Sequence, residues 1–386
     1  MSRIIILSIS FLFCLPSFGQ INFYEGSVSE IMAMAKEENR PIFVDVYTTW
    51  CGPCKWLSKN HFQDTEVGNF FNKNYLGFKI DAEKGEGVDF AKKYNVRAYP
   101  TLLFIDGDGN LLHKAVGAPK DNEALIAIGE KASDPEAQLY SLKRRYEEGE
   151  IEPRILRNYA LALADAYEDP SKIAEQYFEM TSLDAITNEE EWDFFTKTVR
   201  DLQSDLFQQF VKNKDQFIEA HGEKVDQHIS SVVDYSINQV VSNKDEAGLE
   251  ALKGLFREMY ENDYKEKIDL LNYRFYFSDP RSRHNYATTY LNNYDVNWQD
   301  LNGAAWAYYE NVTDKEELRD ALSWAQRSVA LDANYYNTDT EAHLLYKLRY
   351  WKDAKKAAKR AIKVAKAAGE DPAGTVALLK KIKSKR

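Results

Sequence analysis

The feature that most constrains the fold of this chain is a pair of cysteines, Cys51 and Cys54, directly after a run of β-branched and aromatic residues. The run spans residues 42–47 and predicts a buried β-strand. Gly52 and Pro53 separate the cysteines and predict the first turn of a helix, because a proline there loses only an N–H that has no partner in that turn. The pair is therefore expected at the start of a helix that follows a buried strand.

Such a pair can bind a metal, form a structural disulfide or exchange electrons. The other cysteines and the histidines of the chain help to decide between these three uses. The chain has 386 residues, three cysteines and six histidines. A zinc site needs further ligands, and no histidine stands at ligand spacing from the pair. A structural disulfide across so short a loop would remove little entropy from the unfolded chain. The remaining interpretation is a redox pair, with no metal and no cofactor beyond its own reversible disulfide.

The N-terminus predicts a secretory signal peptide over residues 1–19. Arg3 is followed by about a dozen apolar residues, which are too few to cross a bilayer easily. Small residues precede a cleavage position near Gly19 and Gln20. The alternative is an uncleaved N-terminal anchor. Cleavage would remove Cys14 and leave the pair as the only thiols of an exported protein on the periplasmic or cell-envelope side.

Apolar runs separated by turn residues predict an α/β domain over residues 20–132, with a mixed central sheet and flanking helices. Residues 106–110 are rich in Asp and Gly and are predicted to form a hairpin turn, because they lack the glycine and glutamate positions of a calcium-binding loop. The predicted elements are a helix over residues 27–39, a strand over 42–47, a helix opening at the cysteine pair with Trp56, Leu57 and Phe62 on its apolar face, a strand over 76–80, a helix over 88–94, strands over 101–105 and 111–116, and a helix over 122–131.

Four short segments within residues 21–132 form a distinctive pattern. They are Phe43-Val44-Asp45, Trp50-Cys51-Gly52-Pro53-Cys54-Lys55, Ala98-Tyr99-Pro100-Thr101 and Gly117. This pattern resembles the thioredoxin family of thiol–disulfide oxidoreductases, which implies a thioredoxin fold and dithiol–disulfide exchange at the pair. Residues 61–67 also resemble the soluble thioredoxin-like domain of the membrane thiol–disulfide interchange reductase.

Position and resemblance together suggest roles for five residues. Cys51 lies at a helix N-terminus, whose free N–H groups favour a thiolate, so we expect it to be the exposed nucleophile. Cys54 is one turn further on, and we expect it to be shielded and to resolve the mixed disulfide. Gly52 and Pro53 form the turn into the helix. The resemblance implies that Asp45 is a buried acid that takes the proton of Cys54 through water, and the alternative is a solvent-exposed aspartate at a strand edge.

The resemblance also implies a substrate-binding rim around the pair. Pro100 is expected to have a cis peptide bond, and the backbone of Tyr99 is expected to accept an extended client strand. Trp50 and Gly117 are expected to complete the rim, with simple packing as the alternative for Trp50. A lysine that the family often has on the neighbouring strand is not matched, since a glycine falls at that position and Lys79 lies one side-chain alternation away.

The composition changes after the first third of the chain. Glycine and proline become sparse, and amphipathic patterns predict helices almost throughout. We expect an α-helical domain over residues 133–300. We expect a second all-α domain of helical repeats over residues 301–386, ending in a capping helix.

An internal repeat supports the prediction for the last of these domains. Arg319-Asp320-Ala321 recurs as Lys352-Asp353-Ala354, at an offset of 33 residues. Residues 350–354 resemble the start of the second helix of a tetratricopeptide repeat, whose period is about 34 residues. The predicted fold class is therefore an α/β thioredoxin fold followed by a tetratricopeptide-like helical region.

These features predict an exported thiol–disulfide oxidoreductase that reduces the disulfides of client proteins. The Gly-Pro dipeptide between the cysteines favours a reductase, and a membrane thiol reductant is the expected electron donor in an oxidising compartment. Protein partners are expected on the helical repeats, while the net charge of −11 argues against nucleic acid. Two alternatives stay open: a helical-repeat binding module with a regulatory redox pair, and a disulfide isomerase or chaperone.

Overall fold

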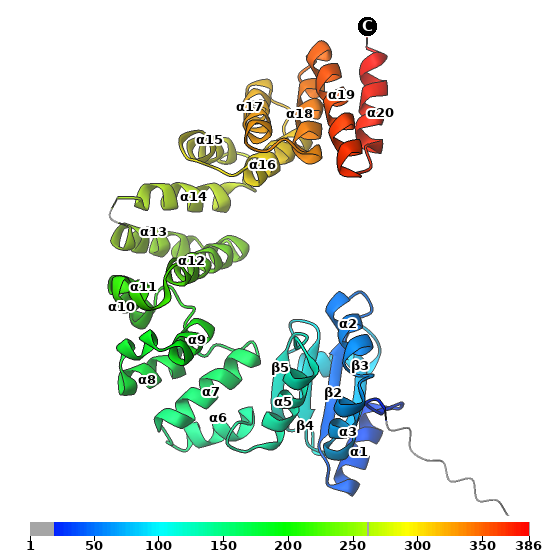
Figure 1. The fold of residues 1–386 in the computed structure, drawn as a ribbon, viewed down its shortest axis with the longest axis vertical. Coiled ribbons are helices and arrows are strands. Elements are labelled where there is room, and N and C mark those ends of the chain that lie inside the picture. The colour runs from blue at the N-terminus through cyan, green and yellow to red at the C-terminus, as the bar shows by residue number, and fades with distance from the viewer. Residues whose placement is uncertain (1–18, 261, 386) are drawn as a thin grey trace, which may run out of the picture. The chain divides into compact units, whose positions relative to one another are not determined.

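The computed structural model describes residues 19–260 and 262–385, so the predicted signal peptide lies outside the described residues except for Gly19. The chain divides into two compact units between Val232 and Val233. The first unit contains a five-stranded sheet with helices, and the second unit consists of helices (Figure 1). None of the helices in the described ranges is long and apolar enough to cross a membrane.

Five strands form one mixed sheet in the first unit, in the order β1-β3-β2-β4-β5. The first three in this order are parallel, and β4 and β5 are each antiparallel to the strand before. The predicted α/β class and the four predicted strands are confirmed, whereas β1 is too short to show an alternating pattern. The strands are β1 (Phe23–Tyr24), β2 (Ile42–Tyr47), β3 (Leu76–Asp81), β4 (Thr101–Ile105) and β5 (Leu111–Val116).

Five helices cover the two faces of this sheet (Figure 1). Helices α1 and α4 pack on the face that contains Val44, and α2, α3 and α5 pack on the face that contains Phe43. Because side chains alternate along a strand, Asp45 lies on the same face as Phe43, which is the face that α2 covers. The helices are α1 (Val28–Glu38), α2 (Gly52–Asn60), α3 (Thr65–Asn74), α4 (Glu86–Lys93) and α5 (Asn122–Ser133).

The helix that carries the cysteine pair is shorter than predicted. It ends before Phe62, and α3 is a separate helix whose N-cap is Asp64. Leu57 is buried as predicted, and Phe62 is buried beyond the end of the helix. Trp56 is 44% exposed, so the prediction that it lies on the apolar face is wrong.

Further helices of the first unit pack against strand β5, which lies at the edge of the sheet. The N–H of Leu139 in α6 donates to Nδ1 of His113 at 3.2 Å, and the Lys114 ammonium lies 3.7 Å from the Glu168 carboxylate after α7. Burial lowers the pKa of His113 to about 4, so its ring is neutral and Nδ1 accepts at neutral pH. The helical elements are α6 (Leu139–Glu147), α7 (Pro153–Asp165), α8 (Ser171–Thr181), η1 (Leu183–Thr187), α9 (Glu189–Thr198), α10 (Asp205–Lys212), α11 (Lys214–His221) and α12 (Lys224–Asn243), which continues into the second unit.

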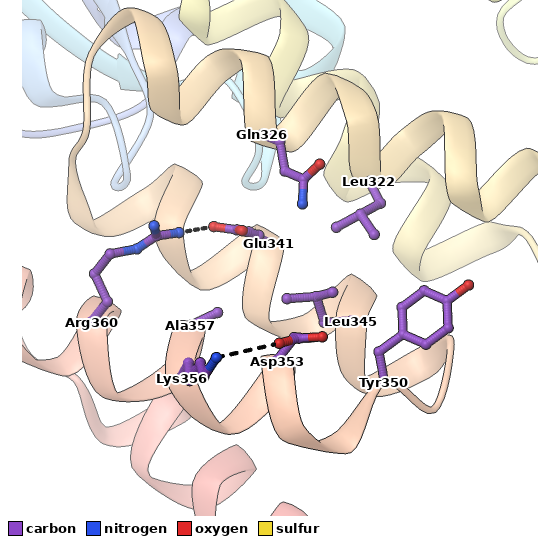
Figure 2. A pocket seen from close by; sticks show the side chains of 9 residues that line it. All are labelled: Leu322, Gln326, Glu341, Leu345, Tyr350, Asp353, Lys356, Ala357 and Arg360. Carbon is purple, nitrogen blue, oxygen red and sulfur yellow. Dashed lines mark hydrogen bonds and ion pairs between the residues drawn. The ribbon is translucent and has the colours of Figure 1, made fainter.

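The second unit contains the predicted sequence repeat on two helices, α17 and α19. Ala321 and Ala325 of α17 and Ala354 and Ala358 of α19 are fully buried, as expected for small residues where helices approach closely. Figure 2 shows α17, α18 and α19 around a pocket of about 540 Å³. The helices are α13 (Glu246–Met259), α14 (Tyr264–Tyr276), α15 (Arg283–Asn293), α16 (Trp298–Asn311), α17 (Lys315–Leu331), α18 (Tyr335–Lys347), α19 (Trp351–Ala368) and α20 (Ala373–Lys383).

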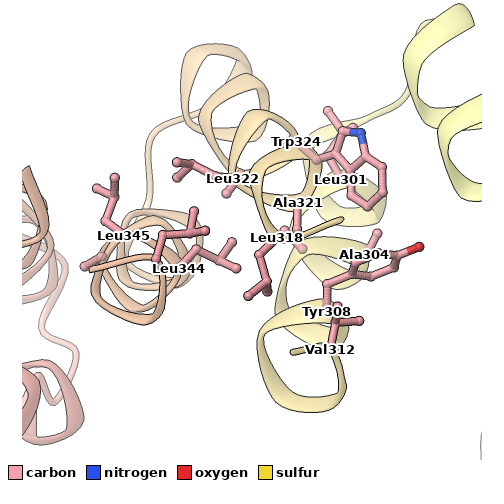
Figure 3. Packing of buried hydrophobic residues seen from close by; sticks show 14 of the residues in the cluster. Leu301, Ala304, Tyr308, Val312, Leu318, Ala321, Leu322, Trp324, Leu344 and Leu345 are labelled. Carbon is pink, nitrogen blue, oxygen red and sulfur yellow. The ribbon is translucent and has the colours of Figure 1, made fainter. Parts of the chain in front are cut away.

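A buried cluster around Trp324 forms the core of helices α15–α20 (Figure 3). The Trp324 ring is fully buried and meets the ring of Tyr308 edge-on, with the centroids 5.0 Å apart. Its Nε1–H donates to the side chain of Asn292 at 2.8 Å, so the polar atom of the indole is satisfied within the core. The all-α character of the C-terminal region is confirmed, and its assignment to tetratricopeptide-like repeats stays a prediction.

The close packing of α19 gives a stability prediction. Ala358→Leu should lower the free energy of unfolding by about 1–3 kcal/mol, because Ala358 is fully buried and a larger side chain must push α19 away from its neighbours. Ala367→Leu is the matched control, since Ala367 is exposed on the same helix and should change stability by less than about 0.5 kcal/mol. Urea unfolding followed by circular dichroism measures both. Equal effects would contradict close packing at the repeat.

Candidate active site at the cysteine pair

Cys51 and Cys54 form a disulfide at the start of α2, with their Cα atoms 5.3 Å apart. Cys51 is the N-cap residue of the helix, and the N–H of Cys54 donates to its Sγ at 3.1 Å. Pro53 lies in the first turn, as predicted, and both Gly52 and Pro53 are exposed. The sulfur of Cys51 therefore lies at the partially positive end of the helix, which favours its thiolate once the disulfide is reduced.

Burial does not distinguish the two cysteines in this oxidised state. Cys51 is 3% exposed and Cys54 is 4% exposed, so the expectation of an exposed Cys51 above a shielded Cys54 is wrong for the disulfide form. The difference between them is their position in the helix. Cys51 caps α2 from outside, whereas Cys54 lies within the first turn. Position, rather than exposure, singles out Cys51 as the candidate nucleophile.

Asp45 is fully buried, so the alternative of a solvent-exposed aspartate at a strand edge is wrong. Its Oδ2 lies 2.8 Å from the Lys79 ammonium, and its Oδ1 is buried with no hydrogen-bond partner among the described residues. Burial raises the pKa of Asp45, and the nearby Lys79 ammonium opposes this effect without cancelling it. A buried carboxyl with a raised pKa and an unsatisfied oxygen is suited to take up a proton.

Lys79 lies opposite Asp45 on the neighbouring strand. The expectation that the family's lysine is not matched in this chain, which rested on counting side-chain alternation, is therefore wrong. Strands β2 and β3 are parallel and pair so that Asp45 lies directly opposite Lys79. The Lys79 ammonium also donates to Oγ of Ser58 in α2 at 3.2 Å and lies 4.8 Å from the centre of the Phe62 ring. The sequence did contain a signal for this pair, because Asp45 and Lys79 are each the fourth residue of their strand.

Pro100 and Gly117 belong to different loops and lie next to each other. The Tyr99–Pro100 peptide bond is cis, as the resemblance implied. The N–H of Gly117 donates to the carbonyl of Pro100 at 2.8 Å. Gly117 has a φ of +98°, which side-chain-bearing residues rarely adopt, and a Cβ added there would meet no heavy atom within 4 Å. The backbone at Gly117, next to Pro100, therefore has open space beside its Cα.

Trp50 is 66% exposed, so simple packing does not account for it. Its Nε1–H donates to both carboxylate oxygens of Glu83, each at 3.0 Å, and its ring meets that of Tyr99 edge-on at 6.0 Å. Because Trp50 adjoins Cys51 and Tyr99 adjoins Pro100, this contact brings the cysteine pair and the cis-proline loop together. Glu83 was not predicted, since it lies in the turn after β3 and no local pattern distinguishes it.

The sequence raised two metal questions, one at the cysteine pair and one at residues 106–110. Within residues 19–260 and 262–385, no group of three or more histidine, cysteine, aspartate or glutamate residues is placed to hold a metal ion. The segment at residues 106–110 forms the predicted hairpin turn between β4 and β5. Its Asp106 carboxylate accepts the N–H groups of Asp108 and Asn110, both at 2.9 Å.

The sheet order, the disulfide at the start of α2 and the cis-proline beside Gly117 define a thioredoxin-fold protein with a disulfide-forming cysteine pair. A family model described as a thioredoxin-like domain matches residues 28–133, close to the predicted 21–132. Thioredoxin H-type of Oryza sativa subsp. indica is 37% identical over 94 residues, which are 24% of this chain and 69% of that protein. The chain belongs to the thioredoxin-like family through this domain.

Two further comparisons show how much of the chain such likeness covers. Thiol:disulfide interchange protein DsbD of Yersinia pestis is 35% identical over 78 residues, which are 20% of this chain and only 13% of that protein's length. The solution structure of a proposed disulphide-isomerase from Bacteroides thetaiotaomicron is 48% identical and covers 28% of this chain and 88% of its own, with a TM-score of 0.26. These relatives therefore match only about a quarter of this chain, and most of its helices lie outside the matched residues.

Proposed function

We propose that this protein is a thiol–disulfide oxidoreductase that reduces the disulfide bonds of client proteins. The observation that carries the proposal is the Cys51–Cys54 disulfide with Cys51 as the N-cap of α2. A helix N-terminus stabilises a thiolate, and the thiolate is the form of cysteine that attacks a disulfide. The oxidised pair is the form that remains after a client has been reduced.

The reaction follows from the order of the two cysteines. In the reduced protein, the Cys51 thiolate attacks one sulfur of the client disulfide, so a Cys51–client bond forms and the other client sulfur leaves as a thiolate. Cys54 then loses its proton, for which Asp45 is the proposed acceptor through water, and attacks the sulfur of Cys51. The Cys51–Cys54 disulfide forms and the second client sulfur leaves. The client gains two electrons, and protons from Cys54 and solvent complete its two thiols.

Client binding is proposed at the rim around the pair. The backbone of Tyr99, next to the cis-proline, would pair with an extended client segment as an added strand. The exposed ring of Trp50 offers apolar surface beside Cys51, and Glu83 holds that ring in place through its Nε1–H. Gly117 leaves space for the client backbone on the other side of Pro100.

The direction, the location and the partners of the reaction complete the proposal. The Gly-Pro dipeptide supports a reductase, which then needs a donor of two electrons, and we infer a membrane dithiol reductant. A cleaved signal peptide over residues 1–19 would place the protein on the periplasmic or cell-envelope side. The helices of residues 133–300 and the tetratricopeptide-like repeats of residues 301–386 would bring protein partners to the pair.

The reduction potential of the pair separates this proposal from its alternatives. A potential near −270 mV, which is about that of thioredoxin, supports a reductase. A potential of about −180 mV or higher supports an isomerase or an oxidant instead. A pair that exchanges with no protein disulfide supports a binding module with a regulatory disulfide. Equilibration of the full-length protein against glutathione or dithiothreitol buffers measures the potential.

A trapping variant tests the proposed order of attack. Cys54→Ser should convert the transient mixed disulfide into a stable one, because a serine cannot release the client from Cys51. We expect covalent complexes with exported proteins that are visible on non-reducing gels and disappear with dithiothreitol. The Cys51→Ser/Cys54→Ser double variant is the matched control and should capture nothing. Equal capture by both variants would remove the main support for the proposed function.

A further inference from the structure

A pocket of about 300 Å³ lies directly beside the loop that contains Gly117. Val116, Gly117 and Pro119 line one side of it, and alanines of α5 line another. Asp165 at the end of α7 and Lys197 near the end of α9 complete the lining. These last two residues lie outside residues 28–133, which are the part that matches the thioredoxin-like domain. The helices that follow the domain therefore contribute to a pocket that the domain does not form alone.

The pocket is connected to the cysteine-pair site through two backbone contacts. Val116 pairs with Thr101, which directly follows Pro100, and the N–H of Gly117 donates to the carbonyl of Pro100 at 2.8 Å. The space above the Cα of Gly117 is open. An extended client segment that pairs with the backbone beside Pro100 would therefore pass over Gly117 and reach this pocket. The client residue in the pocket would lie one or more positions along the client chain from the client's disulfide.

The charged groups of the pocket form a small network with excess positive charge. The Asp165 carboxylate lies 3.2 Å from the Lys131 ammonium and 2.6 Å from the Lys197 ammonium. Burial alone would raise the pKa of Asp165, but the two ammonium groups outweigh burial and hold this pKa below its usual range. Asp165 is therefore charged at neutral pH and fixes both lysines at the pocket. Each ammonium has three N–H donors, so both retain donors for a second carboxylate.

The apolar part of the lining suits the stem of an acidic side chain. Ala124, Ala127 and Ile128 of α5 line the pocket and carry no polar side-chain atom. A glutamate could pack its methylene groups against these residues and place its carboxylate against the N–H donors of Lys131 and Lys197 that Asp165 does not use. A lysine or arginine of a client would instead meet two ammonium groups and only one carboxylate.

We propose that this pocket binds an acidic side chain of the client, glutamate in particular, at a short distance along the chain from the disulfide that is reduced. This inference rests on the proposed function and adds a substrate preference to it. The thioredoxin-like domain supplies the reacting sulfurs and Lys131, and α7 and α9 complete the selective pocket with Asp165 and Lys197. Clients with an acidic residue at that position are bound more tightly at the rim and are reduced faster.

Synthetic peptides test the preference on the full-length protein. Peptides with one disulfide are made with Glu, Gln or Lys at successive positions on either side of a half-cystine. We expect kcat/KM to be about 10-fold higher for Glu than for Lys at one of these positions, roughly the effect of one hydrogen bond to a charged group. The same peptides with serine in place of both half-cystines are titrated against the oxidised protein by calorimetry, which reports the preference without turnover.

Three variants identify the pocket as the source of the preference. Lys197→Gln should abolish most of the preference for Glu, and Ala127→Leu should do the same by filling the pocket without a change of charge. Lys120→Gln is the matched control, because Lys120 is an exposed cation near Gly117 that does not line the pocket. Thermal unfolding confirms that each variant is folded.

The outcomes separate this inference from the proposed function. Reduction of a small-molecule disulfide, which does not reach the pocket, should be the same in all variants. An absence of that reduction in the wild-type protein contradicts the proposed function, and calorimetry still tests the pocket. Equal binding of Glu and Lys peptides by the wild-type protein overturns the inference. An equal loss of preference in Lys120→Gln and Lys197→Gln also overturns it.

Discussion

Cys51→Ser should lower kcat/KM for disulfide reduction by at least about 10³-fold, because a serine hydroxyl is not ionised near neutral pH and cannot take the place of the attacking thiolate. The helix N-terminus acts on the side chain that caps it, and in this chain that side chain is Cys51. The loss should be seen equally with client peptides and with a small-molecule disulfide, since the variant lacks the nucleophile and retains the binding surface.

Alkylation of the reduced protein gives an independent measurement of the same property. Cys51 should react with iodoacetamide at pH 7 faster than a cysteine in an unfolded peptide, because alkylation requires a thiolate. Mass spectrometry locates the label, and Cys54 should react more slowly. Labelling of Cys51 at the rate of the peptide thiol, or residual activity of Cys51→Ser within about 10-fold of the wild-type protein, would contradict its assignment as the nucleophile.

Asp45→Asn should have two opposite effects, slower turnover and higher stability. Turnover should fall on the order of 10²-fold, because an asparagine cannot accept the proton of Cys54. The free energy of unfolding should be higher than that of the wild-type protein at alkaline pH, because the variant removes a carboxylate whose charged form is disfavoured by full burial. The partner that it leaves behind, Lys79, has a side chain that is 26% exposed and can be hydrated.

The pH dependence of this stability difference has a definite sign. Burial raises the pKa of Asp45 above its value in the unfolded chain. Such a carboxyl contributes stability that is fully present below the unfolded-state pKa and is lost as the pH rises through the folded-state pKa. The gap between Asp45→Asn and the wild-type protein should therefore widen as the pH rises.

Thermal and urea unfolding of the oxidised proteins over a range of pH measure this gap. Asp108→Asn is the matched control, because Asp108 is an exposed carboxylate paired with Lys36 and should show neither effect. A gap that narrows with rising pH would contradict a raised pKa for Asp45. Unchanged turnover in Asp45→Asn would remove this residue from the proposed proton transfer.

The parts of the site that could be predicted are those that depend on neighbours in the sequence. The Gly-Pro dipeptide predicts the helix that begins at Cys51, and the apolar residues on either side of Asp45 favour its burial. The cis bond of Pro100 was implied only by the family resemblance, since trans is the commoner state of a bond before proline. Glu83 was missed because its contact with Trp50 joins distant parts of the chain.

The fold shows the same distinction between local and long-range information. The apolar runs predict four of the five strands, but the order of the strands depends on long-range contacts. The matching positions of Asp45 and Lys79 in their strands indicate a pair only once β2 and β3 are known to be parallel neighbours in register. The buried alanines of α17 and α19 were recognisable from their repeat. The packing of α6 and α7 on β5 was not predictable, because Leu139 and His113 meet through tertiary structure alone.

The cover that α6 and α7 provide for β5 limits how this chain can be divided. His113, Lys114 and Ala115 are buried although they lie on an outer strand of the sheet. A fragment that stops before α6 would lose the contact of His113 with Leu139 and the contact of Lys114 with Glu168, and it would leave the edge strand unprotected against pairing with other polypeptides, which favours aggregation. Gene fusion or domain shuffling would therefore have to carry the first helices along with the cysteine pair, as one module.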